Sequence, residues 1–243
     1  MLSFLKNKKR TKRQVCAAVV AAAGSSERMG GGDKLMETLN GVPVLAHTLR
    51  ALQSAETIGE IVIAAREEAV VEVSRLCKEY GIDKCSKVVV GGASRAESVL
   101  LAATEVSEDA AFLAVQDGAR PLVTQELIDR VVKKAKRCNA AAPAVAVKDT
   151  IKVVREDGSV AETPPRGTLR AVQTPQVFDA QLLRAALQSA LESGAQITDD
   201  CSAVERLGKL VYLVEGDEEN IKITTPADLL TAQAILNARG ERR

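Results

Sequence analysis

Short apolar runs rich in β-branched residues alternate along this chain with segments whose apolar residues recur at helical spacing. Strands and helices that follow one another in this way constrain the chain to an α/β fold, with a mainly parallel sheet and helices on both faces. Strands are predicted at Val15 to Ala21, Ile61 to Ala65, Val88 to Val90, Phe112 to Gln116 and Ala142 to Val147. Helices are predicted from Pro43 to Leu52, Glu68 to Tyr80, Ser94 to Glu105 and Thr124 to Cys138.

The alternation stops between Asp149 and Gln173. Residues 150–154, the turn Asp157-Gly158 and the stretch from Val160 onward predict a protruding β-hairpin arm rather than another strand-helix unit. Such an arm has few core residues of its own and needs another surface to lie on. That surface belongs either to a second copy of the chain, which makes residues 149–173 a dimerisation arm, or to the arm's own domain.

After the arm the patterns predict a helix from Asp179 to Glu192, a second helix N-capped by Thr198, a strand from Leu210 to Val214 and a last helix after Thr225-Pro226. We therefore expect one domain over residues 15–239. It is preceded by a basic, flexible tail at residues 1–14, which lacks the apolar centre of a secretory signal.

The first predicted strand leads directly into a glycine-rich loop that carries two cations. Ala22, Ala23 and Gly24 open the loop, three glycines follow at 30–32, and Arg28 and Lys34 supply positive charge. Glycines let main-chain N–H groups approach a ligand closely, so the loop favours a nucleoside triphosphate. The alternative is a glycine-rich surface turn with two solvated cations.

Two common phosphate-binding loops do not match this segment. A P-loop requires Lys followed by Ser or Thr, but Lys34 is followed by Leu35. A dinucleotide fingerprint requires Gly-x-Gly-x-x-Gly and an acidic residue at the end of the second strand, where Arg66 stands instead. This argues against NAD as the ligand, whereas Arg66 leaves NADP binding as an alternative.

Two more polar segments follow predicted strands, so we expect them at the same edge of the sheet. Gly91-Gly92 precede a helix that presents Arg95 and Ser98 on one face, either to bind a base edge or as an ordinary turn. Asp117 ends the fourth strand, where it either holds Mg²⁺ or another divalent ion beside the phosphates or opens the loop as an Asx-turn residue.

Composition excludes several other classes of protein. The 243 residues carry 33 basic and 32 acidic side chains, a formal charge of +1, so no global field attracts nucleic acid or an anionic membrane. No apolar stretch is long enough for a membrane helix. Five cysteines without Cys-x-x-Cys spacing indicate reduced thiols and a cytoplasmic protein. The only histidine, His47, lies within a helical pattern and is interpreted as structural.

Several separate motifs together resemble the 2-C-methyl-D-erythritol 4-phosphate cytidylyltransferase family, over roughly residues 15 to 239. The motifs are Ala22-Ala23-Gly24 with Arg28-Met29 and Lys34, Gly91-Gly92 with Arg95 and Ser98, Asp117 to Pro121, Asp149-Thr150, Arg166, Thr174-Pro175-Gln176, Ile197-Thr198-Asp199, and Glu215-Gly216 with Asn220-Ile221-Lys222.

The resemblance implies a Rossmann-like homodimeric enzyme that transfers a cytidylyl group from CTP to a sugar-alcohol phosphate in isoprenoid-precursor synthesis. By the motif match, the catalytic residues are Arg28 and Lys34 on the triphosphate and Arg166 and Lys222 on the incoming phosphate. Thr150 and Arg166 would serve the partner's site. The match also assigns substrate binding to Ala22, Ala23, Gly24, Gly91, Gly92, Ala93, Ser98, Asp117, Thr150, Arg166 and Lys222, and the metal to Asp117.

This chain departs from the family pattern at several positions. Ser26 replaces a glycine, Asp33 replaces the proline before the loop lysine, and Pro165 replaces an aspartate before the arm's arginine. Asp33 adds a carboxylate beside the expected triphosphate, which repels it unless the side chain is turned away or touches the metal. The alternatives kept open are a ribitol-5-phosphate cytidylyltransferase, a more distant nucleotidyltransferase using another base, and a non-catalytic nucleotide-binding module.

Overall fold

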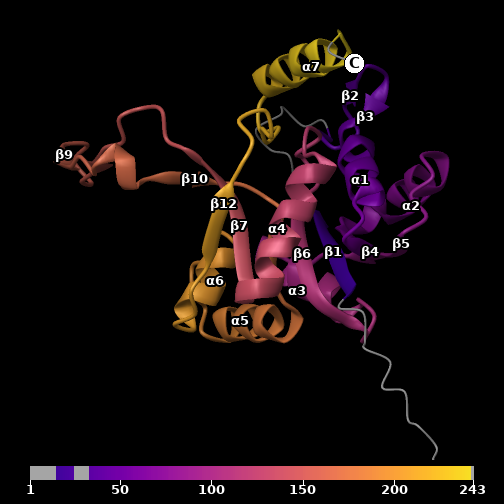
Figure 1. Ribbon diagram of the computed structural model, residues 1–243, viewed down its shortest axis with the longest axis horizontal. Helices are drawn as coiled ribbons and strands as arrows, with labels where there is room; N and C mark the ends of the chain where they lie inside the picture. Colours follow the sequence, from indigo (N-terminus) through magenta and orange to yellow (C-terminus); the bar gives the residue numbers. More distant parts are fainter. Residues whose placement is uncertain (1–14, 25–32, 242–243) are drawn as a thin grey trace, which may run out of the picture.

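The computed structural model describes residues 15–24 and 33–241. The predicted tail at 1–14 lies outside the described residues, as do Ser26 and Arg28. A central sheet of eight strands organises the described chain (Figure 1). Its strands are β1 (Val15–Ala22), β4 (Ile58–Ala65), β5 (Cys85–Val90), β6 (Ala110–Asp117), β7 (Ala140–Ala146), β10 (Arg170–Val172), β11 (Gln176–Asp179) and β12 (Tyr212–Glu215).

The strand order is β10-β7-β11-β6-β1-β4-β5, and β12 also pairs with β7. β1 lies between β4 and β6, parallel to both, and β5 continues this parallel half. β11 is antiparallel to both β6 and β7, which leaves β7 and β12 running in the same direction as β6. β10 also runs antiparallel to β7. The expected mainly parallel sheet is therefore confirmed.

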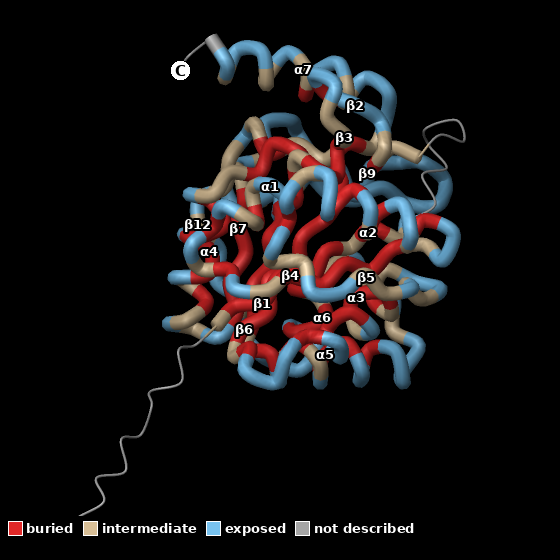
Figure 2. Tube along the Cα trace, turned by 90° about the vertical axis from the view of Figure 1, so that its right-hand side faces the viewer, coloured by how far each residue is buried: buried red, intermediate tan, exposed pale blue. Residues whose placement is uncertain are grey.

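β1 shows why the centre of the sheet consists of uninterrupted apolar runs. Cys16, Ala18 and Val20 face one hydrophobic core, whereas Ala17 and Val19 face a second core on the other side. A strand buried on both faces has no polar side to alternate with, so its sequence is apolar throughout. Figure 2 shows this burial concentrated in the central strands.

Helices cover both faces, as predicted. The first core is closed by α1 (Val44–Ser54), α2 (Val70–Glu79), α4 (Gln125–Cys138) and α7 (Pro226–Glu241). The second core is closed by α3 (Arg95–Thr104), α5 (Ala180–Glu192) and α6 (Asp200–Arg206). Short pieces complete the order: the hairpin β2 (Thr38–Leu39) and β3 (Val42–Pro43), and the 3₁₀ turns η2 (Glu67–Ala69) and η3 (Arg166–Thr168).

The helix predicted to be capped by Thr198 begins one residue later than expected. Asp199 is the N-cap: its carboxylate accepts a hydrogen bond from Ser202 N at 2.9 Å. The Ser202 hydroxyl lies within hydrogen-bonding distance of Asp199 N, which completes a reciprocal capping box. Asp199 rather than Thr198 is the N-cap, because its pairing with Ser202 satisfies backbone groups at both ends of the first turn.

Four short strands, β2, β3, β10 and β11, were not predicted. β10 has three residues and β11 has four, too few for a clear period, and both are recruited by the neighbours they pair with. The last strand also lies slightly further along than expected, at Tyr212–Glu215, because its bounds follow the pairing with β7.

Within the arm region, β8 (Val153–Val154) and β9 (Val160–Glu162) pair antiparallel around a turn at Gly158, whose φ is +81°. Both strands are exposed, and Figure 1 shows them projecting away from the sheet. Whether this segment contacts a second copy stays a prediction. Within 15–24 and 33–241, no helix has the length and apolar character needed to cross a bilayer.

Candidate active site

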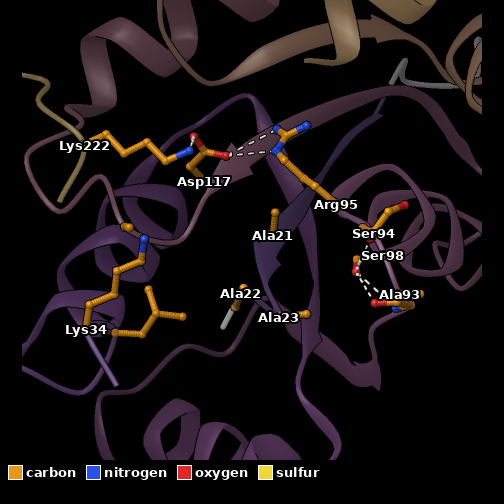
Figure 3. A pocket seen from close by; sticks show the side chains of 14 residues that line it. Ala21, Ala22, Ala23, Lys34, Ala93, Ser94, Arg95, Ser98, Asp117 and Lys222 are labelled. Carbon is orange, nitrogen blue, oxygen red and sulfur yellow. Dashed lines mark hydrogen bonds and ion pairs between the residues drawn. The ribbon is translucent and has the colours of Figure 1, made fainter. Parts of the chain in front are cut away.

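A pocket of about 320 Å³ opens where the parallel strands end. Its walls come from the segments after β1, β5 and β6 and from the segment between β12 and α7, so distant parts of the chain meet here (Figure 3). The lining residues are Ala21, Ala22, Ala23, Gly24, Lys34, Leu35, Gly92, Ala93, Ser94, Arg95, Ser98, Asp117, Ala119 and Lys222.

Asp117 is the centre of charge in this pocket. Its Oδ1 lies 3.3 Å from both Nε and Nη2 of Arg95, and its Oδ2 lies 2.8 Å from Lys222 Nζ and 3.8 Å from Arg120 Nε. Burial alone would raise the pKa of Asp117, but Arg95, Lys222 and Arg120 together outweigh burial and hold this pKa below its ordinary value. Asp117 is therefore an ionised anchor for three cations.

The backbone around Asp117 is held on both sides. Asp117 N donates to Thr174 Oγ1 at 3.1 Å, and Gly118 N donates to Ala21 O at 3.0 Å. Thr48 Oγ1, buried in α1, donates to Gly118 O at 2.9 Å. This accounts for the Thr174-Pro175-Gln176 motif, whose threonine orients the strand end that carries the carboxylate.

The glycine pair after β5 forms the opposite wall. Ser98 Oγ accepts a hydrogen bond from Gly92 N at 3.1 Å and donates to Ser94 O at 2.8 Å, which ties the loop to the start of α3. A side chain at Gly91 would place Cβ 2.5 Å from Cβ of Ala23, so only glycine fits there. Gly92, Ala93 and Ser98 line the pocket, and Gly91 packs behind them against Ala23.

Asp33, the carboxylate expected to repel a triphosphate, is paired with Arg66 at the end of β4. Asp33 Oδ1 also accepts from Leu35 N at 3.0 Å, and Asp33 O accepts from Met36 N at 2.9 Å. The side chain thus closes a tight turn around Lys34, while Arg66 compensates its charge. Arg66 is the residue that left NADP binding as an alternative, and here it is engaged by Asp33.

The segment carrying Lys222 is fastened by buried polar groups. Arg120 Nη1 donates to Asn220 O at 2.6 Å, and Asn220 Nδ2 donates to Thr174 O at 3.0 Å. Ile223 N donates to Ala119 O at 2.8 Å on the other side of the lysine. Arg120 therefore braces the segment that carries Lys222.

The sequence predicts only base binding for Arg95 and assigns no role to Asp200. Arg95 Nη2 lies 2.8 Å from Asp200 Oδ2, and Asp200 is fully buried. The signal that pointed toward Asp200 was its place beside Asp199 in the Ile197-Thr198-Asp199 motif. A local pattern cannot show that the first turn of α6 faces the pocket.

The two predicted site residues in the arm do not line this pocket in their own chain. Thr150 and Arg166 are exposed in the arm region, and Arg166 Nη1 donates to Lys148 O at 2.7 Å. Arg28 lies outside the described residues. His47 does not line the pocket either: its Nε2 lies 3.0 Å from Leu39 O, in keeping with a structural role.

Among the described residues that line this pocket, Asp117 is the single carboxylate available to a metal ion. Across the described stretches, no group of three acidic, histidine or cysteine side chains is arranged to hold one. Both oxygens of Asp117 already face cations, so the residues present do not form a resident metal site by themselves. The metal role of Asp117 stays a prediction.

A family model described as 2-C-methyl-D-erythritol 4-phosphate cytidylyltransferase matches residues 16–238. The chain belongs to this family. The curated protein of that name from Bacillus cytotoxicus is 46% identical over 222 residues, which cover 91% of this chain and 97% of the relative. The one from Halalkalibacterium halodurans is 45% identical, with coverage of 93% and 99%.

Solved structures of the cytidylyltransferase family share the fold. The 4-diphosphocytidyl-2C-methyl-D-erythritol synthase of Anaerococcus prevotii superposes with a TM-score of 0.82 at 28% identity, covering 92% of this chain and 96% of that one. The 2-C-methyl-D-erythritol 4-phosphate cytidylyltransferase of Thermus thermophilus gives 0.74 at 32% identity, with coverage of 91% and 98%. The chain is thus an enzyme of the nucleotidyltransferase class, with a Rossmann-like fold.

Proposed function

We propose that this pocket joins CTP to 2-C-methyl-D-erythritol 4-phosphate, giving 4-diphosphocytidyl-2-C-methylerythritol and pyrophosphate for isoprenoid-precursor synthesis by the non-mevalonate route. The supporting observation is that Lys34 and Lys222, which lie on segments far apart in sequence, line one pocket together with Gly92. Figure 3 shows the amino group of Lys34 directed toward the Asp117–Lys222 pair.

The reaction requires charge compensation more than proton transfer. An oxygen of the sugar phosphate attacks the α-phosphorus of CTP, a new P–O bond forms, and the bond to the bridging oxygen breaks as pyrophosphate leaves. A phosphate monoester with a second pKa near 6 is mostly a dianion at neutral pH, so no general base is required. Bringing two polyanions within about 3 Å of each other instead requires fixed cations.

The proposed roles follow from this requirement. Lys34 and Arg28 hold the triphosphate and stabilise the charge that builds on the α-phosphate and the pyrophosphate. Lys222 and Arg166 hold the incoming phosphate in line. Gly91, Gly92, Ala93 and Ser98 bind the cytosine and ribose, together with residues 22–24.

In this proposal Asp117 would hold Mg²⁺, or another divalent ion, that arrives bound to the nucleotide, and the ion would neutralise phosphate charge. Mg²⁺ in nucleotide sites is commonly held by one or two carboxylates plus substrate phosphates, so Asp117 is the protein's contact for it. The chain's own part is to supply that carboxylate already ionised, as the surrounding cations ensure.

The exposed hairpin β8–β9 supports a homodimer in which each arm brings Thr150 and Arg166 to the partner's pocket. Ile151, Val153 and Val154 of this arm are exposed apolar residues, which a second copy would cover. The five free cysteines support a cytoplasmic location, where thiols remain reduced.

The test measures pyrophosphate release from CTP and Mg²⁺ in three parallel reactions, with methylerythritol phosphate, with ribitol 5-phosphate and without acceptor. Release is expected only in the first. Release with ribitol phosphate alone would assign the other acceptor. CTP binding without release in any reaction would indicate a non-catalytic module.

A further inference from the structure

Asp200 is the most deeply buried charged side chain beside the pocket. It is 0% exposed, although it occupies the first position of a surface helix. Its Oδ2 faces Arg95 Nη2 at 2.8 Å as an ion pair, but neither carboxylate oxygen receives a well-aligned hydrogen bond within the described chain. A carboxylate buried in this way is costly, so its retention calls for a specific role.

Helix capping does not account for this burial. The capping box of α6 is supplied by Asp199 and Ser202, and an acidic residue in the first turn would act on the helix dipole equally well if exposed. Gln176 already anchors the start of the helix, since its Nε2 donates to Asp199 Oδ2 at 2.7 Å and its Oε1 accepts from Cys201 N at 3.0 Å.

Arg95 is the group that Asp200 contacts. Its guanidinium spans two carboxylates, with Nε and Nη2 facing Asp117 at 3.3 Å and Nη2 closer to Asp200. Nη1 has no protein acceptor in the described chain and remains for a ligand, because Arg95 lines the pocket. Two carboxylates on different elements hold the guanidinium from two directions, whereas Asp117 alone would hold it through one oxygen, Oδ1.

We propose that Asp200 is a positioning residue that acts through Arg95, holding its guanidinium in the orientation that binds the nucleotide. This rests on the proposed function, because it takes CTP as the occupant of the pocket. The charged groups around Asp200 are Arg95 from α3, Asp117 from β6 and Asp199 at the start of its own helix, so Arg95 is the only cation among them.

The experiment is calorimetric binding of CTP to the folded, full-length chain, with Tm measured in parallel. Asp200→Asn keeps the side-chain volume and removes the charge. The expected result is a Kd for CTP raised about 10-fold, with kcat at saturating CTP within about 2-fold, because Lys34 and Lys222 are untouched. Asp129→Asn is the matched control, since Asp129 is also buried but binds Thr57 away from the pocket.

A purely electrostatic role of Asp200 predicts the opposite change in the Kd for CTP. Removing a negative charge beside the pocket would tighten the binding of an anion, so a lower Kd in Asp200→Asn would overturn the proposal. An unchanged Kd in the folded variant would also overturn it. Should Asp200→Asn fail to fold, Asp200→Ser provides the same comparison with a smaller side chain.

The dependence on Arg95 is tested by a double-mutant cycle. In an Arg95→Ala background, Asp200→Asn should change the Kd for CTP no further, because the group through which it acts is gone. An equal effect in both backgrounds would show that Asp200 acts by another route. Failure of the wild-type enzyme to bind CTP would overturn the proposed function as well, whereas wild-type binding with additive variants would overturn this inference alone.

Discussion

Lys222 Nζ lies 2.8 Å from Asp117 Oδ2, although Asp117 ends β6 and Lys222 follows β12, and these two strands lie on opposite sides of β11. The pair joins the two halves of the sheet at the pocket. Arg95 occupies the other carboxylate oxygen, so Asp117 organises cations that would otherwise repel one another. The predictions below follow from this cluster and from the loop and arm beside it.

Lys222→Ala should lower kcat/KM for the sugar phosphate about 100-fold or more, because the incoming dianion loses a positioned cation. Tm should change little, since Asp117 keeps Arg95 and Arg120 as partners. Steady-state kinetics with varied acceptor and a thermal melt provide the two readouts. Lys133→Ala, an exposed lysine on α4, is the control; a loss of equal size there would remove the specific role of Lys222.

Lys34→Ala and Arg28→Ala should each lower kcat by about two orders of magnitude, equivalent to about 2.7 kcal/mol of transition-state stabilisation. In the proposed mechanism both cations stabilise the negative charge that builds on the α-phosphate and on the departing pyrophosphate. Pyrophosphate release under saturating substrates measures the effect. Normal turnover in both variants would exclude this loop from the mechanism.

The arm can be tested by mixing two inactive variants, Arg28→Ala and Arg166→Ala. If each arm completes the partner's pocket, a mixed dimer contains one intact site, and random exchange should restore about a quarter of wild-type activity. Confirmed subunit exchange without any recovery would mean that each protomer completes its own site.

Asp200 should give stability a distinctive dependence on pH. Burial raises the pKa of this carboxyl in spite of Arg95, so the folded state binds the proton more tightly than the unfolded state does. The resulting stabilisation is present below the ordinary aspartate value of 3.8 and is lost as pH rises through the folded-state pKa. Asp200→Asn removes that loss, so Tm of the variant minus Tm of wild type should increase from pH 4 to pH 8.

The pH dependence of stability expected from Asp117 has the opposite sign. Its pKa is held below the ordinary value, so its contribution to stability is present above 3.8 and is lost as pH falls through the folded-state pKa. Tm of Asp117→Asn relative to wild type should therefore be lowest at neutral pH and recover on acidification. Thermal melts of both variants over one buffer series distinguish the two carboxylates, and matching curves would contradict the assignment.

The sequence by itself determined the parallel half of the sheet and most of the pocket. Strands buried on both faces are continuous apolar runs, and parallel strands bring their following loops to one edge. The sequence alone therefore places Lys34, Gly92 and Asp117 together. The family motifs identified Lys222 as a site residue. No hydrophobic periodicity of its own segment would have indicated that role.

Only the tertiary structure decided which charges face one another. β11 is four residues long, and its antiparallel place between β6 and β7 depends on its neighbours rather than on its own period. The Asp33–Arg66 pair and the Arg95–Asp200 pair likewise join separate elements. A sequence pattern reports the environment of one element at a time, whereas an ion pair depends on how two elements pack, and that is settled only when the whole core closes.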